Sequence, residues 1–283
     1  MKRRKFLCNV LIVFVLLFSL VTPSITAQAD MGPKPASYVT IQGIEGEYVA
    51  CFAAKSAWGP NYDYERYLAW QEEDGYVPFE YNPIMEYHDA DGFKWITRYY
   101  ECNGEAKISF TYYCPDEYKI VVYQNGQFLM ATEPLQMYAF TTYYKVDFSS
   151  ATVTTPEQIK VEKNYDYFGE ILNLLIRVVL TLALEIGLFY LFRLYTKWNF
   201  RVVVIVNLIT QIALNVAVNI MQFFSGALAA IFLLFVLEFA ILMVEFIAYQ
   251  ILFKDKKRWK ILLYPVLANA ISFACGFIVF GFM

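Results

Sequence analysis

Histidine is nearly absent from this sequence, and cysteine pairs of the CxxC type are missing. The 283 residues include a single histidine, His88, and five cysteines, none of them in CxxC spacing. A lone histidine supplies neither a Ser-His-Asp triad nor an HExxH motif, and the cysteine spacing provides no zinc ribbon or redox pair. The sequence therefore predicts a protein that is not an enzyme of the familiar classes, and it indicates no cofactor.

Charged residues are also scarce, at 17% of the chain against 58% hydrophobic residues, which is too apolar for an ordinary soluble domain. Residues 30–166 hold 21 acidic and 10 basic side chains, a net charge of −11, whereas residues 167–283 hold 5 acidic and 9 basic, a net charge of +4. Nucleic-acid binding needs a basic face to meet phosphates. We therefore expect two regions in different surroundings and no nucleic-acid partner.

Residues 1–29 have the pattern of a secretory signal peptide. Residues 2–5 are all basic, residues 6–21 are apolar, and Ala-Gln-Ala stands at 27–29. This pattern predicts cleavage after Ala29, with an uncleaved anchor as the alternative. Both interpretations place the region that follows outside the cytoplasm.

Four apolar stretches in the C-terminal half are each long enough to cross a membrane. They cover residues 168–194, 202–223, 227–252 and 261–282, and a helix needs about 20 residues to span the hydrocarbon core. The connections at 193–201 and 254–260 are basic, whereas the turn at 223–227 is uncharged. Because basic loops stay in the cytoplasm, the sequence predicts a multi-pass α-helical bundle of four spans at 167–283 in the cell membrane. Its basic loops would be cytoplasmic, and the N-terminal domain and the C-terminus extracytoplasmic.

The segment at 30–166 has the composition of a mostly β extracytoplasmic domain. Residues 38–42, 47–54, 107–114, 118–123, 127–132 and 138–148 are rich in Tyr, Phe, Val, Ile and Thr. Asn125-Gly126 between two of these runs indicates a type I′ hairpin, whose central residues both need positive φ. We expect a small antiparallel sandwich, with a helix near 64–71 in a long connection.

Cysteines and an aspartate pair are the candidate sites of this domain. Cys102 and Cys114 flank an expected hairpin and are candidates for a disulfide in an oxidising compartment, with free buried thiols as the alternative. Asp89 and Asp91 are spaced like the first carboxylates of a calcium loop. The twelfth position of that loop is Tyr100 instead of glutamate, which favours an ordinary turn over a metal site.

Each expected span carries polar residues on one helix face, at spacings of four or seven positions. This polar seam consists of Arg177, Glu185, Asn207, Gln211, Asn215, Glu238, Glu245 and Asn269. Ionisable groups are expensive in hydrocarbon, so we expect the seam to face the bundle interior. Arg177 can balance one glutamate, Glu238 by its expected depth, which leaves two carboxyl groups to be protonated, hydrogen-bonded or bound to an ion. Packing by ordinary hydrogen bonds between helices is the alternative.

Several short motifs are similar to those of a bacterial family of uncharacterised envelope membrane proteins. They are Asp-Met-Gly-Pro-Lys-Pro at 30–35, Tyr-Asp-Tyr-Phe-Gly-Glu at 165–170, Val-Asn-Leu-Ile-Thr-Gln at 206–211 and the glutamate pair of the third span. The resemblance implies the same architecture of signal sequence, outer domain and four spans, and it implies no particular activity.

Two functions are compatible with these features, the first as the prediction and the second as its alternative. One is an envelope binding or sensing protein, or a partner scaffold, whose outer domain binds a ligand. Its helices would contact membrane lipid and another membrane protein or a second copy of the chain. The other is a small ion- or proton-coupled transporter, or a component of one, that uses the glutamates of the seam.

Overall fold

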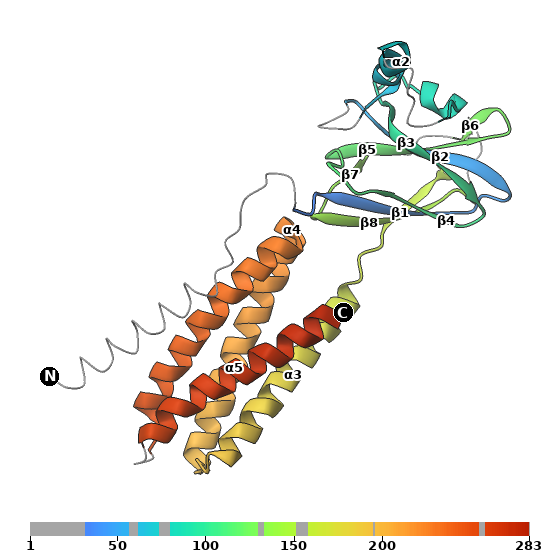
Figure 1. The fold of residues 1–283 in the computed structure, drawn as a ribbon. Coiled ribbons are helices and arrows are strands. Elements are labelled where there is room, and N and C mark those ends of the chain that lie inside the picture. The colour runs from blue at the N-terminus through green and yellow to red at the C-terminus, as the bar shows by residue number, and fades with distance from the viewer. Residues whose placement is uncertain are drawn as a thin grey trace. The chain divides into compact units, whose positions relative to one another are not determined.

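The computed structural model describes residues 32–56, 62–73, 80–129, 133–150, 158–194, 196–254 and 258–282. A mixed β region of two sheets is followed by helices (Figure 1). The expected signal peptide at 1–29 lies outside the described residues.

The first sheet has the strand order β4-β1-β8-β9. Its strands are β1 (Ala36–Gln42), β4 (Ala106–Phe110), β8 (Thr141–Asp147) and β9 (Lys160–Lys163). β1 runs antiparallel to β4 but parallel to β8. The prediction of a purely antiparallel sandwich is therefore wrong, because the pairing of strands far apart in the chain depends on tertiary packing that strand composition does not encode.

The second sheet has the order β3-β2-β5-β6, and β7 also pairs with β5. Its strands are β2 (Glu47–Ala54), β3 (Lys94–Asn103), β5 (Glu117–Gln124), β6 (Gln127–Leu129) and β7 (Leu135–Gln136). Asn125 and Gly126 join β5 to β6 with φ angles of 52° and 80°. These positive angles confirm the predicted hairpin, since a type I′ turn requires them at both positions.

The two sheets face each other across one hydrophobic core. β1 contributes Val39 and Ile41 to this core, and the second sheet contributes Phe52, Tyr118 and Ile120, all at most 1% exposed. Each fully buried side chain of this size contributes about 1.5–3 kcal/mol relative to an exposed one. The sandwich architecture predicted from the sequence is therefore present, with a mixed first sheet.

The second sheet is covered on its other face as well. α2 (Tyr64–Glu73) and the 3-10 helix η1 (Pro83–Glu86) lie over this face (Figure 1), where Tyr67 and Met85 pack with Trp95 of β3. The helix expected near 64–71 is confirmed. Because both faces are covered, β2 and β5 are almost entirely buried, and their sequences lack the alternation of a half-exposed strand.

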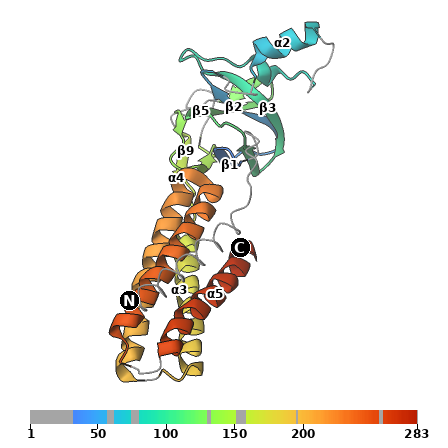
Figure 2. The same ribbon diagram turned by 60° about the vertical axis from the view of Figure 1, so that its left-hand side comes forward.

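Three helices follow the sandwich: α3 (Tyr167–Leu191), α4 (Lys197–Leu252) and α5 (Arg258–Phe282). Each of the three contacts the other two. α4 is broken at Gly226, whose φ of 84° and ψ of 171° are not helical. Its two limbs consequently fold back and lie side by side (Figures 1 and 2).

Within the described part of the chain, two helices, α3 and α4, are long and apolar enough to cross a membrane by length and composition. The four spans expected from the sequence fall within α3, the two limbs of α4, and α5. Four separate spanning helices are therefore not confirmed, since the expected turn at 223–227 is a one-residue break inside a 56-residue helix.

Helices α3 and α4 begin at residues that cap them. Asp166 Oδ1 accepts a hydrogen bond of 2.8 Å from the N–H of Gly169 at the start of α3. Thr196 Oγ1 accepts one of 3.1 Å from the N–H of Asn199 at the start of α4. A side-chain acceptor at the N-cap satisfies a backbone N–H that has no partner within the helix, which fixes where each helix begins.

The connections between the helices lie at one end of the bundle. Lys260 Nζ donates to the carbonyl of Phe192 at 2.6 Å, which joins the start of α5 to the end of α3. Trp198 Nε1 donates to the carbonyl of Leu252 at 2.9 Å, which joins the two ends of α4. The break at Gly226 is therefore remote from both connections.

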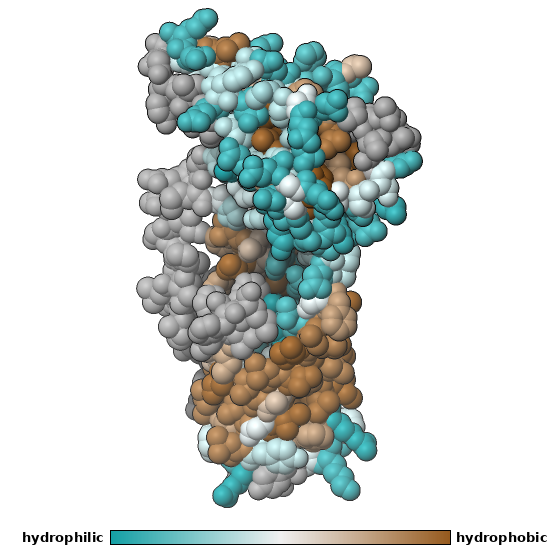
Figure 3. All heavy atoms as spheres, turned by 90° about the vertical axis from the view of Figure 1, so that its right-hand side faces the viewer, coloured by the Kyte–Doolittle hydropathy of each residue, from teal (hydrophilic) through white to brown (hydrophobic). Residues whose placement is uncertain are grey.

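The outward faces of the helices are apolar. Leu191, Ile209 and Ile251 are 73%, 63% and 74% exposed, and hydrophobic residues cover this part of the molecule in Figure 3. A contiguous apolar surface of this kind indicates contact with another molecule or a membrane. Together with the length of α3 and α4, it suggests association with a membrane.

Candidate functional site

The polar seam faces the inside of the helical bundle. Glu185, Asn207 and Glu245 are completely buried, and Asn269 is 4% exposed. Gln211 and Asn215 are buried beside them, whereas Arg177 and Glu238 are only partly buried. The four-residue spacing in α4 explains this placement, because positions i and i+4 lie one above the other on a helix.

Glu245, on the second limb of α4, is held by donors from two other helical segments. Thr210 Oγ1 of the first limb lies 3.0 Å from Glu245 Oε1, and Asn269 Nδ2 of α5 lies 2.6 Å from Oε2. The predicted polar seam did not include Thr210, although this residue stands three positions after Asn207 on the same helix face. Both carboxyl oxygens of Glu245 thus have a donor that comes from a neighbouring helix.

Glu185, on α3, has a different environment. Neither of its carboxyl oxygens has a hydrogen-bond partner among the described residues. The carboxyl groups of Glu245 and Glu238 lie within electrostatic range, and the amide of Asn207 is close without the geometry of a hydrogen bond. A fully buried carboxyl beside a second one must be neutralised by a proton or a cation, because desolvation and repulsion both oppose its charge.

We define the carboxyl cluster as Glu185, Asn207, Thr210, Glu245 and Asn269. Besides Glu185, it contains two buried acceptors without a partner, the Oδ1 atoms of Asn207 and Asn269. Donors within the cluster are already engaged, so the remaining polar atoms are all oxygens. Such a set of oxygens suits a hard cation or a proton, and it offers nothing to an anion.

Aromatic side chains close one side of the carboxyl cluster. Tyr249 Oη accepts a hydrogen bond of 2.9 Å from Asn207 Nδ2, and Tyr264 Oη donates to the carbonyl of Glu185 at 3.2 Å. The rings of Tyr249 and Tyr264 lie 5.6 Å apart and are fully buried with Phe189. Tyr264 therefore belongs to the core of the bundle.

The remaining polar residues of the seam mostly bond within their own helices. Asn215 Nδ2 donates to the carbonyl of Gln211 at 2.8 Å, and Ser272 Oγ donates to that of Asn269 at 3.2 Å. Arg177 is under the electrostatic influence of Glu170, two turns earlier in α3. Glu238 lies within electrostatic range of Glu185 and Glu245, so the part of the seam outside the carboxyl cluster makes mainly local contacts, with Glu238 as the exception.

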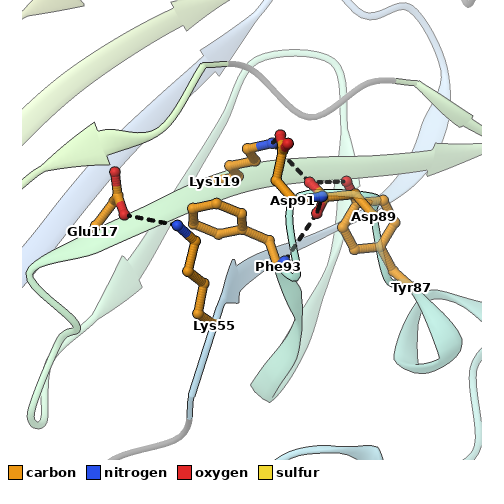
Figure 4. A network of polar contacts seen from close by, with 7 residues as sticks. All are labelled: Lys55, Tyr87, Asp89, Asp91, Phe93, Glu117 and Lys119. Carbon is orange, nitrogen blue, oxygen red and sulfur yellow. Dashed lines mark hydrogen bonds and ion pairs between the residues drawn. The ribbon is translucent and has the colours of Figure 1, made fainter.

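The two aspartates of the sandwich, Asp89 and Asp91, both form ion pairs with one lysine. Lys119 Nζ lies 2.7 Å from Asp89 Oδ2 and 2.9 Å from Asp91 Oδ2 (Figure 4). Asp89 Oδ1 also accepts hydrogen bonds from the N–H groups of Asp91 and Phe93. Burial alone would raise the pKa of Asp89, but Lys119 and these N–H groups together hold it below its ordinary value. An ammonium group thus takes the place that a calcium loop would give to its ion.

Two lysines flank the ring of Phe93 beside this pair. Lys119 Nζ lies 4.6 Å and Lys55 Nζ 4.9 Å from the ring centroid, and Lys55 also forms an ion pair of 3.6 Å with Glu117 (Figure 4). The opposing charges and the cation–π contacts fix this loop on the sheet. The arrangement is therefore that of an anchored turn.

The expected disulfide is not formed, since Cys102 and Cys114 are both free. Cys102 lies on β3 in the second sheet, whereas Cys114 follows β4 in the first sheet. The chain crosses between the sheets after Asn103, so the two strands are not the hairpin that the sequence suggested. Burial raises the pKa of both thiols.

A cavity of about 390 Å³ lies where the sandwich meets the break of α4. Tyr143 of β8 and Tyr165 of the linker line it, together with Phe223 beside the break and the carboxyl groups of Asp166 and Glu170. The neighbouring N–H of Phe140 donates to the carbonyl of Phe223 at 2.8 Å. This cavity could not be predicted from the sequence, because its walls come from three separate segments.

No family model, curated protein or solved structure matches this chain, and the resemblance to envelope membrane proteins stays a prediction.

Proposed function

We propose that this chain is a membrane protein whose helical bundle binds a proton or a cation at the carboxyl cluster, as an ion-coupled transporter or a component of one. The observation that carries the proposal is Glu185, a completely buried carboxyl that has no hydrogen-bond partner among the described residues and has a second buried carboxyl nearby. Ionisable groups within membrane helices are costly and often mark ion pathways or proton relays.

Four membrane crossings fit the helices if each limb of α4 crosses separately. A straight helix of 56 residues would measure about 84 Å, against roughly 30 Å of hydrocarbon, so the break at Gly226 is needed for α4 to fit a membrane. The contacts of Lys260 and Trp198 hold both basic connections at one end, which suits the cytoplasmic side. The sandwich and the C-terminus would then be extracytoplasmic.

Interhelical packing alone accounts less well for the carboxyl cluster. Asparagine and threonine commonly join membrane helices by hydrogen bonds, at roughly 0.6 kcal/mol each. Glu245 can be explained in this way, because both of its oxygens accept a hydrogen bond from another helical segment. Glu185 cannot, since it makes no such bond.

The test is ion flux into liposomes that contain the purified full-length protein. Proton and sodium uptake under an imposed gradient should exceed that of empty liposomes, and Glu185→Gln should reduce it at least tenfold. Asn215→Leu is the control, because Asn215 is a buried polar residue of α4 that bonds within its own helix and lies outside the carboxyl cluster. Equal flux through wild type and Glu185→Gln would contradict the proposal.

A second function, ligand binding or sensing at the sandwich, is favoured by the cavity beside the break of α4. A cavity of about 390 Å³ with aromatic and carboxylate walls falls in the range of small-molecule sites. A ligand there would contact the sandwich and the helices together, and so alter how the bundle meets another membrane protein or a second copy of the chain. Crosslinking in intact membranes at native expression should then capture that partner, and a chain that stays solitary would count against this function.

A further inference from the structure

We infer that the carboxyl cluster is a binding site for one dehydrated monovalent metal cation of the sodium class, coordinated between Glu185 of α3, Asn207 of α4 and Asn269 of α5. This inference rests on the proposed function and narrows it from any proton or cation to one kind of ion.

The buried oxygens without partners are the starting point. Four of them occur in the cluster: both carboxyl oxygens of Glu185 and the Oδ1 atoms of Asn207 and Asn269. Each unsatisfied buried acceptor destabilises the fold, so four in one cluster indicate a partner that contacts several of them together.

The orientation of each amide group is held by the hydrogen bonds of its nitrogen. Asn207 Nδ2 donates to the carbonyl of Val203 at 3.0 Å and to Tyr249 Oη at 2.9 Å. Asn269 Nδ2 donates to the carbonyl of Pro265 at 3.0 Å and to Glu245 Oε2 at 2.6 Å. Exchanging N and O in Asn269 would break both of its bonds, whereas in Asn207 it would break only the bond to Val203, because the hydroxyl of Tyr249 can also donate. The Oδ1 atom of Asn269 is therefore held as an acceptor by two hydrogen bonds, and that of Asn207 by one.

A proton satisfies this arrangement only in part. A protonated Glu185 offers one O–H donor, which can reach one amide oxygen and leaves its own carbonyl oxygen and the other amide without partners. A metal cation needs no donor direction and can coordinate carboxylate and amide oxygens at once. One cation also balances the charge that Glu185 would carry.

The number of oxygens favours a monovalent ion over calcium or magnesium. Calcium takes about six to eight oxygens and magnesium about six in strict octahedral geometry, usually with several waters. The cluster offers four free oxygens, and Glu245 already accepts a hydrogen bond on each of its own. Among the residues that the structure describes, no group of three or more His, Cys, Asp or Glu side chains is placed to hold a metal.

The experiment is protection of Glu185 from dicyclohexylcarbodiimide, an apolar reagent that modifies protonated buried carboxyl groups, in the full-length protein in detergent. Sodium chloride should slow modification of Glu185 at least fivefold, measured by mass spectrometry of the peptide, whereas choline chloride and calcium chloride at equal ionic strength should not. Thermal unfolding gives an independent reading, because an ion that binds only the folded protein raises Tm.

Variants separate a site from a general salt effect. Glu185→Gln should lose the sodium-dependent rise in Tm, and Asn269→Leu should lose it as well. Asn215→Leu, which changes a buried amide that bonds within its own helix, should retain it. Equal protection by choline, stronger protection by calcium, or a sodium-dependent Tm that survives in Glu185→Gln would each overturn the inference. If sodium does not change the rate of modification but the liposomes still take up protons, the sodium site is rejected and the proposed function stands. If sodium has no effect and there is no ion flux, both are rejected.

Discussion

Two acidic sites in this molecule differ in how their charge is compensated. In the sandwich, Lys119 contacts both Asp89 and Asp91. In the helices, Glu185 has no basic partner and no donor within the described residues. A charge whose partner is built into the fold stabilises a turn, whereas a charge left without a partner requires a proton or an ion from outside. The comparison thus separates a structural site from a functional one.

The largest effect is expected for Glu245→Ala, which removes the best-satisfied carboxyl of the helices. It removes one acceptor from the hydroxyl of Thr210 and one from the amide of Asn269 and opens a cavity, which should lower the free energy of unfolding by about 3–5 kcal/mol. Glu245→Gln keeps the shape and one acceptor and should lower it by about 1 kcal/mol at most. Thermal unfolding in detergent measures both, and equal losses would show that these hydrogen bonds do not hold Glu245.

Lys119→Met should have the next largest effect, because it removes the partner built into the sandwich. Loss of a buried pair costs about 3–5 kcal/mol, and we expect about 2–3 kcal/mol here because Asp91 is 70% exposed. Lys55→Met is the matched control: it removes the other ammonium beside Phe93, and its side chain is 57% exposed, so about 0.5 kcal/mol is expected. Hydrogen exchange of the β5 amides in the full-length protein measures the loss of stability in both variants. Similar exchange rates in the two variants would contradict the expected difference between Lys119 and Lys55.

Acid should weaken the sandwich through the same pair and through Asp63, which forms an ion pair of 2.6 Å with Lys94. The pKa of Asp63 and that of Asp89 are both held low in the fold. A carboxyl with a depressed pKa contributes stability above its unfolded pKa of about 3.9 and loses it as the pH falls through the lower folded value. Hydrogen exchange of β3 and β5 should therefore be constant from pH 7 to 5 and accelerate below about pH 4. Acceleration already between pH 7 and 5 would point to other groups.

The smallest change in stability is expected for Glu185→Gln. This variant tests most directly whether Glu185 differs from the aspartates of the sandwich. No hydrogen bond is lost, and the new amide can donate to one of the oxygens that lack a partner. Tm in sodium-free buffer should stay the same or rise by the equivalent of about 1 kcal/mol. A drop comparable to that of Glu245→Ala would show that Glu185 has a structural role, as the aspartates of the sandwich do.

Local features were predictable from the sequence, and long-range pairings were not. The Asn125-Gly126 hairpin followed from backbone preference, and the face shared by Asn207, Gln211 and Asn215 followed from helical spacing. The partnership of Lys119 with the aspartates could not be read in the same way, because it joins residues nearly thirty positions apart through sheet packing. The same holds for the free Cys102, whose strand pairs with β2 instead of β4.

The central position of β1 has a consequence for how the chain folds as it is made. β1 lies between β4 and β8, and Ala36 pairs with Thr141. The first strand of the domain can therefore complete its pairing only after nearly the whole domain has been synthesised. A chain emerging N-terminus first can join β1 to β4 early, but the parallel partner arrives only shortly before α3. Such non-local pairing is slow to form. We therefore expect one edge of β1 to remain open during synthesis, a natural place for a chaperone to bind until β8 closes it.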